Sequence, residues 1–479
     1  MNYRMIKYTL GWLMMFEAGF FLVPMITAVV YSEWHTLVAF AISALICLAI
    51  GLLCVYKKPE KTSIFAREGF VIVSLSWILL SIFGAIPFML SGTTTNFIDA
   101  LFETASGFTT TGSSIFREVE SLPKAILMWR SFTHWVGGMG VLVFIMVFLP
   151  LGGGQNMHIM RAESPGPEVS KLVPKVKQTA FILYSIYFVM TFLQFIILLI
   201  SGMGVFEAIN TAFATAGTGG FGVRNDSCAS FSAAQQIIVT VFMLLFSINF
   251  NSYYLILKLK LRDAINSEVK TFIVIVLVAI GIITLNIYQS YGSIGEALRH
   301  ASFTVSSLIS TTGFATEDFD LWPSLSKAVL VLIMFIGACA GSTGGGMKVS
   351  RIIIAFKGFL RELYTLIHPK QVKAITIDKR PVDREVVRSV NAYLACYALV
   401  FISSLMLITL DDFDLVTNFT AVTATINNIG PGLAIVGPTA NFANFSNISK
   451  LVLTFDMIAG RLELFPMLIL LSPATWKKA

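Results

Sequence analysis

Charged residues are scarce in this chain. Of its 479 residues, 13% are Asp, Glu, Lys or Arg and 56% are hydrophobic. A soluble chain normally carries about 25% charged residues, so a soluble globular protein, a disordered chain and a coiled coil are all excluded. With a mean hydropathy of +0.79, the composition predicts a polytopic membrane protein.

Paired cysteines and clustered histidines are also lacking. The five cysteines include no CxxC pair, which argues against metal ligation and a disulfide scaffold. An enzyme within the membrane would need His, Asp or Ser groups at one depth, but the five histidines are scattered through loops and the ends of apolar runs. We therefore expect no enzymatic activity. The cysteines are Cys47, Cys54, Cys228, Cys339 and Cys396, and the histidines are His35, His134, His158, His300 and His368.

Long apolar runs are abundant. A membrane-spanning helix needs about 20 mostly apolar residues, and ten runs meet this length. The first is too long for a cleaved signal peptide and lacks its cleavage site. The sequence therefore predicts an all-α protein with ten spans. The runs cover residues 8–30, 36–56, 69–91, 124–151, 178–202, 232–257, 270–290, 326–356, 389–410 and 448–472.

The distribution of lysine and arginine predicts the orientation. With the N-terminus inside, 26 of the 34 basic residues fall in inner loops, six fall outside, and Arg130 and Arg461 lie within spans. This bias indicates that both termini are cytoplasmic. It also accounts for the net charge of +7 without a nucleic-acid partner. The outer loops are rich in Asp and Glu, which either attract cations or are ordinary solvated loops.

Four shorter apolar stretches, 97–108, 205–216, 296–310 and 415–427, lie between pairs of spans on the outer side. They are too short to cross a membrane, and each ends in a turn rich in Gly, Thr or Asn. When the turns are aligned on Gly112, Gly217, Gly313 and Gly430, the spacings are 105, 96 and 117 residues. This period fits a unit of span, half-helix, turn and span.

Each such unit crosses the membrane twice, so the four units are parallel repeats around an axis along the membrane normal. We expect them to enclose a pseudo-fourfold pore, with two extra spans at the N-terminus. The expected boundaries are 1–60 for the N-terminal pair, 61–157 for repeat 1, 158–262 for repeat 2, 263–365 for repeat 3 and 366–479 for repeat 4.

The turns suit a cation. Non-helical backbone at membrane depth is tolerated where it is buried in protein or lines a water-filled cavity, and glycine lets successive carbonyls point the same way. Carbonyl oxygens from four segments can replace the hydration shell of an ion, and the half-helix C-termini add partial negative charge. The alternative is small-residue helix packing; four matching turns favour a pore.

Five motifs between about residues 69 and 472 match a known family. They are SGFTTTG at 106–112, STTGFAT at 310–316, TATINNIGPG at 423–432, GACAGSTGGGMK at 337–348 and AGRLELFP at 459–466. By these motifs the chain resembles the Trk/Ktr/HKT superfamily of potassium-translocating subunits, and most closely its Trk-type membrane subunits. The two additional N-terminal spans match the Trk type.

The resemblance implies potassium uptake across a plasma membrane, the inner membrane in bacteria, through a selectivity filter. A serine at the first-repeat glycine goes with sodium permeation in this superfamily, so Gly112 implies potassium selectivity over a sodium-permeable variant. Potassium would be the ion bound. The implied filter residues are Thr110, Thr111, Gly112 and Ser113; Thr215, Ala216, Gly217 and Thr218; Thr311, Thr312, Gly313 and Phe314; and Asn428, Ile429, Gly430 and Pro431.

The run 326–356 is too long for one span, and its Gly-rich middle, 337–346, predicts a broken helix with a loop below the filter. A kink for close packing is the alternative. The resemblance implies that this loop is the gate and that Arg461 faces the pore beneath the filter; a structural ion pair is the alternative for Arg461. The implied gating residues are Gly337, Gly341, Ser342, Thr343, Gly344, Gly345, Gly346 and Arg461.

The resemblance also implies partners. The basic segment 351–388 would dock a cytosolic RCK-type (TrkA-like) nucleotide-binding ring, and the protein would form a homodimer in the lipid bilayer. The chain has no GxGxxG motif, so we expect it to bind no nucleotide. No buried carboxylate stands out as a proton relay, which favours passive gated flux over a proton- or sodium-coupled symporter.

Overall fold

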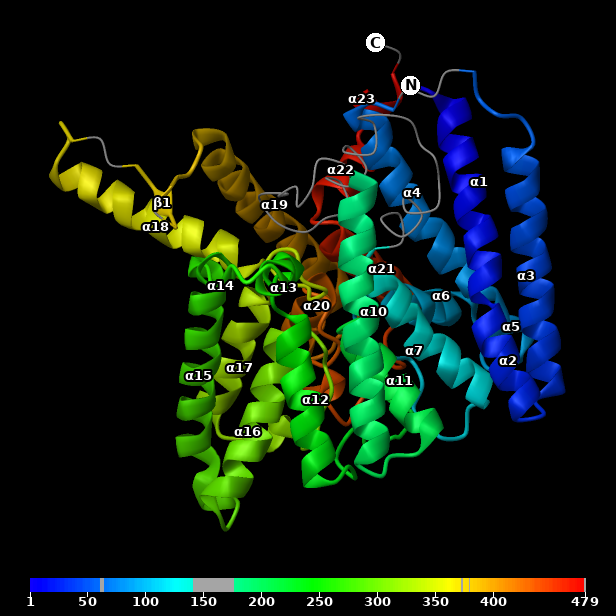
Figure 1. Cartoon of the computed structure of the whole chain (residues 1–479), viewed down its shortest axis with the longest axis horizontal. Coiled ribbons are helices and arrows are strands. Elements are labelled where there is room, and N and C mark those ends of the chain that lie inside the picture. The colour runs from blue at the N-terminus through cyan, green and yellow to red at the C-terminus, as the bar shows by residue number, and fades with distance from the viewer. Residues whose placement is uncertain (61–63, 141–175, 372–373, 379, 478–479) are drawn as a thin grey trace.

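A computed structural model describes residues 1–60, 64–140, 176–371, 374–378 and 380–477. The described chain is helical apart from loops and one short antiparallel hairpin, in which β1 (Thr376–Ile377) pairs with β2 (Arg380–Pro381). Both termini lie at the same end of the molecule, and α18 with the hairpin projects sideways from that end (Figure 1). The predicted boundary between repeats 1 and 2, at residues 157 and 158, lies outside the described residues.

The fold is that of a polytopic membrane protein. Within the described residues, six helical stretches are long and apolar enough to cross a membrane. Their side chains that face away from the protein include many exposed Leu, Ile, Val and Phe residues, as expected for helices in contact with lipid. The six stretches are Tyr3–Val30, Trp34–Val55, Ala66–Leu90, Gln178–Ile200, Ser267–Ser290 and Arg384–Asp411.

The order of elements after the N-terminal helices repeats four times as a long helix, a short helix and a second helix of 13–15 residues. The N-terminal helices are α1 (Tyr3–Phe20), α2 (Leu22–Val30) and α3 (Trp34–Val55). The long helices are α4 (Ala66–Gly84, extended by α5, Ile86–Leu90), α10 (Val176–Ile200), α15 (Ser267–Ile287) and α19 (Arg384–Ile408). The short helices are α6 (Phe97–Phe108), α11 (Val205–Ala216), α16 (Ile294–Ile309) and α20 (Leu415–Ile426). The second helices are α7 (Lys124–Gly138), α12 (Ala233–Phe246), α17 (Ser324–Ile336) and α21 (Asn447–Arg461).

Contacts between neighbouring units run in a closed cycle. The second helix of each unit packs on the short helix of the next: α7 on α11, α12 on α16 and α17 on α20. The fourth contact, α21 on α6, returns from the last unit to the first. Each short helix also packs on the long helix of its own unit, as α6 does on α4 and α11 does on α10. The short helices are therefore held on both sides, with their C-terminal ends inside the molecule.

The apolar runs at 232–257, 326–356 and 448–472, which contain three of the second helices, are all interrupted in the structure. The first is bent by 91° between α12 and α13 (Phe250–Leu257). The second is broken between α17 and α18 (Val349–Ile367), and the third between α21 and α22 (Phe465–Leu471), where Glu463 and Leu464 have positive φ. Only the Gly-rich break in the second run was predicted. The remaining short elements are α14 (Leu261–Ala264), α23 (Pro473–Trp476), η2 (Tyr288–Ser290), η3 (Phe319–Leu321), η4 (Thr409–Asp411) and η5 (Ala434–Val436).

Candidate functional site

The four short helices end in the same way. The second residue after each helix end adopts a left-handed conformation, with φ between 55° and 61° at Thr110, Thr218, Thr311 and Asn428. The following amide donates a hydrogen bond to a carbonyl five residues earlier, over 2.8–2.9 Å in all four units. This is the Schellman arrangement, which closes a helix and turns the chain sharply. Each short helix is followed by a turn, and we name these four segments the ring turns. They comprise residues 110–113, 218–221, 311–314 and 428–431.

A glycine with positive φ follows two residues after each left-handed residue, at Gly112, Gly220, Gly313 and Gly430. A Cβ atom on Gly112 would overlap the carbonyl oxygen of Gly219, in the second ring turn. The same relationship joins Gly220 to Thr312, Gly313 to Ile429, and Gly430 to Thr111, where the distance would be 2.8 Å. Each ring turn therefore touches the next, and the fourth touches the first.

The second ring turn is three residues later than the sequence alignment expects. The prediction placed Thr215, Ala216, Gly217 and Thr218 at the site, but Gly217 has φ of −70° and caps α11. A Cβ atom on Gly217 would overlap the carbonyl oxygen of His134, so this glycine serves the contact between α11 and α7. The backbone that matches Gly112 belongs to Gly220, which corrects the alignment of the second turn.

Side chains also join the ring turns. Ser113 Oγ donates to the carbonyl oxygen of Gly430 at 3.1 Å. Asn428 Nδ2 donates to Thr111 Oγ1 at 2.9 Å and to the carbonyl oxygen of Met457 in α21 at 2.8 Å. The fourth turn is therefore bonded to the first by side chains as well as by backbone packing, and Ser113, Gly430, Asn428, Thr111 and Met457 are all buried.

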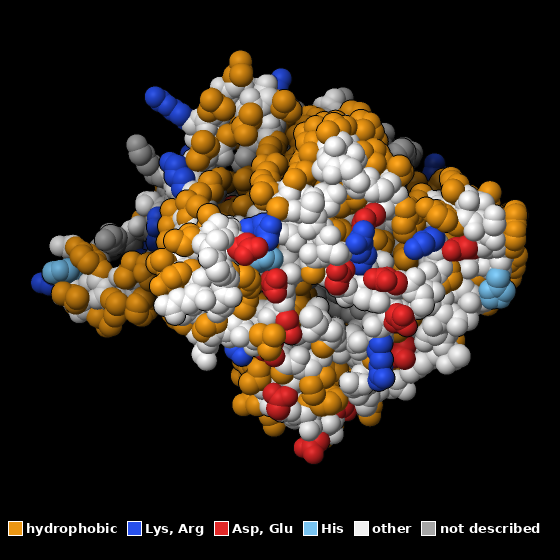
Figure 2. All heavy atoms as spheres, turned by 90° about the horizontal axis from the view of Figure 1, so that it is seen from below, with side chains coloured by type: hydrophobic (Ala, Val, Ile, Leu, Met, Phe, Trp, Pro, Cys, Tyr) orange, Lys and Arg blue, Asp and Glu red, His pale blue; other side chains and the backbone are white. Residues whose placement is uncertain are grey.

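A cavity of about 120 Å³ opens beside the ring turns and is lined by all four glycines. It lies on the face opposite the termini, where Asp and Glu side chains gather (Figure 2). Arg224 lines the rim, and its pKa lies above the ordinary value because the Glu207 carboxylate accepts hydrogen bonds from the guanidinium. The positive charge of Arg224 is therefore neutralised by Glu207.

The Gly-rich segment between α17 and α18 lies against the inner side of the ring turns. The amide of Gly345 donates to Thr311 Oγ1 at 2.6 Å, and the amide of Gly346 donates to the carbonyl oxygen of Asn427 at 3.0 Å. Thr343 Oγ1 donates to the carbonyl oxygen of Phe246 at the end of α12, at 3.1 Å. We call residues 337–348 the inner loop. It contacts the second, third and fourth units, and the sequence predicted its break correctly.

Arg461 reaches from the end of α21 to the inner loop. Its Nη1 donates to the carbonyl oxygen of Thr343 at 2.8 Å, and its Nη2 donates to the carbonyl oxygens of Gly137 and Gly138 at 2.6 Å. The guanidinium therefore joins α7 of the first unit to the inner loop of the third. Its carbonyl partners fit the expectation that a membrane arginine must be satisfied by protein groups.

Several residues that hold the inner loop were missed in the sequence. Lys348 Nζ donates to the carbonyl oxygen of Gly344, and the side chain is 2% exposed. A carboxylate oxygen of Glu268 accepts hydrogen bonds from the amides of Ala340 at 2.8 Å and Ser350 at 3.1 Å. The available signal was a charged residue at the edge of an apolar run, because such a residue must be paired when it is buried in a membrane.

Two carboxylates that the sequence analysis did not single out are buried in the structure. Asp456 in α21 is fully buried; its Oδ1 accepts from Ser404 Oγ at 2.7 Å, and its Oδ2 has no hydrogen-bond partner in the described chain. Glu17 in α1 is also fully buried, and neither of its carboxylate oxygens has such a partner. Both residues must be weighed when coupling to protons is considered.

In the described residues, no group of three or more His, Cys, Asp or Glu residues could hold a metal ion, and all five cysteines are free. What the residues do offer is a ring of backbone oxygens at the ends of four helices. Carbonyl oxygens bind a hard monovalent cation without any net charge from side chains.

Comparison with known proteins agrees with this geometry. A family model described as TrkH, cation transport protein, matches residues 36–478. The Trk system potassium uptake protein TrkH of Escherichia coli (strain K12) is 36% identical over 100% of both chains. The Trk system potassium uptake protein TrkG of the same strain is 32% identical over 99% of both chains.

A solved structure has the same fold. The crystal structure of the potassium transporter TrkH from Vibrio parahaemolyticus matches with a TM-score of 0.90 and 33% identity, and the match covers 100% of both chains. Family model, relatives and structure agree over nearly the whole length. This chain belongs to the TrkH family of cation transport proteins, a family of membrane transporters rather than enzymes.

Proposed function

We propose that the chain takes up potassium through a selective, gated pore on the axis of the four ring turns. The observation that carries this proposal is the closed cycle in which each of Gly112, Gly220, Gly313 and Gly430 faces the carbonyl of the next turn. Segments that touch in a cycle surround an axis, and successive carbonyls on that axis can replace the water around a potassium ion. The relatives named for potassium uptake support this choice of ion.

The proposed filter consists of Thr110–Ser113, Thr218–Phe221, Thr311–Phe314 and Asn428–Pro431. The left-handed residue and the glycine two positions later turn the carbonyls between them in one direction. The C-terminal ends of α6, α11, α16 and α20 meet at this place and add partial negative charge. The acidic face in Figure 2 would raise the local concentration of cations outside the filter.

The inner loop is the proposed gate. It lies directly under the third and fourth ring turns, and Arg461 holds it to the first unit through Thr343. Positive charge below the filter raises the barrier to a cation, and Lys348 holds the same loop by donating to the carbonyl oxygen of Gly344. Movement of the inner loop with Arg461 would lower this barrier and clear the path.

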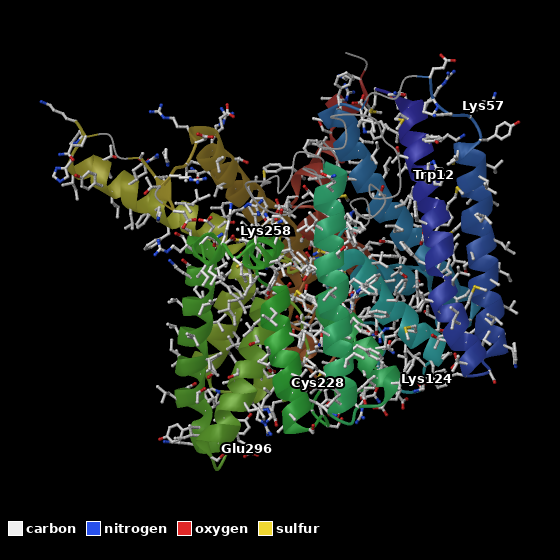
Figure 3. The ribbon with its side chains drawn as sticks, in the orientation of Figure 1. Trp12, Lys57, Lys124, Cys228, Lys258 and Glu296 are labelled. Carbon is white, nitrogen blue, oxygen red and sulfur yellow. The ribbon has the colours of Figure 1, made fainter. Side chains whose placement is uncertain are left out.

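The membrane orientation and the count of ten spans also belong to the proposal. Figure 3 places Lys57 and Lys258 toward the end that carries both termini, and Lys124 and Glu296 toward the opposite end. The excess of basic residues in the loops of the first end makes it cytoplasmic. Ten spans result if α7, α12, α17 and α21 each complete a crossing with the chain that follows them.

Assembly follows from the family in the same way. We infer a homodimer with one pore in each protomer, and a cytosolic RCK-type ring that binds the nucleotide and docks on the basic segment 351–388. In the described part of this segment, α18 projects from the cytoplasmic end and leads directly into the inner loop (Figure 1). A ring that moves α18 would therefore act on the gate.

The alternative is a proton- or sodium-coupled symporter on the same scaffold. Asp456 and Glu17 favour it, since buried carboxylates within a membrane are typical of proton relays. Rubidium and sodium uptake into proteoliposomes that contain the purified chain, with and without a ring partner, tests the proposal. Passive potassium selectivity predicts rubidium uptake that follows the imposed potential and little sodium uptake; equal uptake of both ions would contradict it.

A further inference from the structure

A buried ion pair lies immediately beside the first ring turn. Arg130 Nε in α7 and Glu103 Oε1 in α6 are 2.7 Å apart, and their side chains are 2% and 0% exposed. Burying an ion pair costs free energy, because both charges lose their hydration. Their mutual attraction offsets this loss only when the geometry is good and further hydrogen bonds are made. The contacts of each partner therefore indicate what the pair does.

Glu103 holds the chain that leaves the first ring turn. Its two carboxylate oxygens accept from Ser114 Oγ at 3.0 and 3.1 Å, and Oε2 also accepts from the amide of Ile115 at 2.9 Å. Ser114 and Ile115 come two and three residues after Gly112. The carboxylate thus fixes the exit of the turn to α6, the helix that enters the same turn.

Arg130 contacts the second ring turn and the residue that follows it. Its Nη1 donates to the carbonyl oxygen of Gly222 at 3.3 Å, and its guanidinium lies 4.0 Å from the ring centroid of Phe221. Nη2 donates to Ser114 Oγ at 3.2 Å. A planar guanidinium can make these contacts at once, whereas an ammonium cannot. One side chain therefore joins the segments that follow Gly112 and Gly220.

The other units lack this pair. The residues nine positions before Gly220, Gly313 and Gly430, which correspond to Glu103, are Thr211, Thr304 and Ala421. Gly137 in α7 and Gly460 in α21 occupy equivalent positions, because Gly137 packs on the carbonyl of Phe108 and Gly460 on that of Ile426. The residue seven positions before Gly137 is Arg130, and the residue seven positions before Gly460 is Leu453, so the fourth unit has leucine where the first has arginine. Glu103 therefore has no charged counterpart at the same position in the other three units.

We propose that Glu103 and Arg130 are positioning residues that set the distance between the first and second ring turns and thereby the discrimination between potassium and sodium. This inference rests on the proposed filter. In the cavity-size account of selectivity, a filter rejects the smaller ion because its oxygens cannot move inward to coordinate it. The pair restrains two of the four turns through its hydrogen bonds to Ser114, Ile115 and Gly222.

The test is the sodium-to-potassium permeability ratio of the full chain in planar bilayers or proteoliposomes. Glu103→Gln keeps the shape of the side chain and removes its negative charge, which leaves the buried Arg130 without a carboxylate partner. Losing charge-assisted hydrogen bonds at two turns should raise the ratio at least about tenfold. Ser114→Ala removes the hydroxyl that contacts both partners while the charges stay paired, and should raise the ratio about threefold.

Glu296→Gln is the matched control. It removes one carboxylate from the same face, where Glu296 pairs with Arg299 at 3.7 Å and is exposed to solvent, so it should leave the ratio unchanged. A ratio is independent of the amount of protein, which separates positioning from simple stability. If Glu103→Gln does not reach the membrane, Ser114→Ala decides the question.

Two results would overturn the proposal that Glu103 and Arg130 position the first two ring turns. The first is a sodium-to-potassium permeability ratio in Glu103→Gln that equals the wild-type ratio; if only Ser114→Ala can be made, the same result in that variant counts. The second is an equal rise of this ratio in Glu296→Gln, which would indicate a general electrostatic effect. Both leave the filter in place. A wild-type chain that does not discriminate between the two ions would instead contradict the proposed function itself, so the two failures are distinguishable.

Discussion

The carbonyl oxygen of Gly219 occupies the space that a side chain on Gly112 would need. The two residues are 107 positions apart in the sequence and belong to different repeats. Because the same relationship recurs at the other three glycines, it ties the identity of one residue in each turn to the spacing of the whole ring.

Replacing Gly112 with serine should admit sodium. The added Cβ atom would push the second ring turn away, and φ of +82° is strained for serine. We expect the sodium-to-potassium permeability ratio to rise about tenfold, which corresponds to ~1.4 kcal/mol of lost discrimination. Gly202→Ser is the control, since φ there is +86° but a Cβ atom meets nothing within 4 Å. An unchanged ratio in Gly112→Ser would count against the filter.

The corrected alignment of the second turn can be tested separately. Gly220→Ser should raise the permeability ratio about tenfold, as Gly112→Ser does, because its Cβ atom would overlap the carbonyl oxygen of Thr312. Thr215→Ala should leave the ratio unchanged, since Thr215 Oγ1 donates only within α11, to the carbonyl oxygen of Thr211 at 2.7 Å. The opposite pattern in bi-ionic reversal potentials would restore the alignment on Gly217.

Deleting residues 339–345 should raise basal flux. The deletion removes Thr343, Gly344 and Gly345, which lie against the ring turns and Arg461. We expect rubidium uptake to rise on the order of tenfold without a ring partner, as for removal of a constriction below a filter. Uptake is normalised to the protein found in the membrane. Flux that falls or stays level at a normal protein level would contradict the gate.

Arg461→Gln should also raise flux, with potassium selectivity retained. Removing one positive charge from a site of low dielectric constant lowers the barrier to a cation by roughly 1 to 2 kcal/mol, or about tenfold in rate. Arg67→Gln is a matched control, because Arg67 also donates to backbone carbonyls, at Thr475 and Lys477, but far from the ring turns. Lower flux in Arg461→Gln in single-channel recordings would make Arg461 purely structural.

Asp456→Asn separates passive flux from coupling. Asparagine can still accept the hydrogen bond of Ser404 Oγ, which spans 2.7 Å in the wild type, so the fold should be kept. Passive flux predicts a reversal potential that does not change with external pH in either protein. A wild-type reversal potential that shifts with pH, together with loss of the shift in Asp456→Asn, would establish the proton-coupled alternative.

The sequence predicted the short helices closely. The stretches at 97–108 and 205–216 coincide with α6 and α11, and those at 296–310 and 415–427 differ from α16 and α20 by one or two residues. Apolar stretches too short to cross a membrane are defined on both sides by polar turns, so their ends are visible in the composition. The Gly-rich break before α18 was visible for the same reason.

Other features left no such signal. Between Gly217 and Gly220 the chain has three glycines in four residues, and composition cannot choose among them; the choice depends on where α11 closes and on the packing of Gly217 against His134. The break after α21 has neither glycine nor proline at Leu462–Leu464. The Glu103–Arg130 pair joins two helices, and only tertiary structure brings its members together.

The central claim is that potassium loses its water among the backbone oxygens of the four ring turns. Anomalous scattering from rubidium or thallium, in crystals of the full chain grown with either ion, tests this claim most directly. We predict strong peaks on the axis between Gly112, Gly220, Gly313 and Gly430, which weaken when sodium replaces the heavier ion. Peaks only elsewhere in the protein, with the space between the four glycines closed by side chains, would contradict the account.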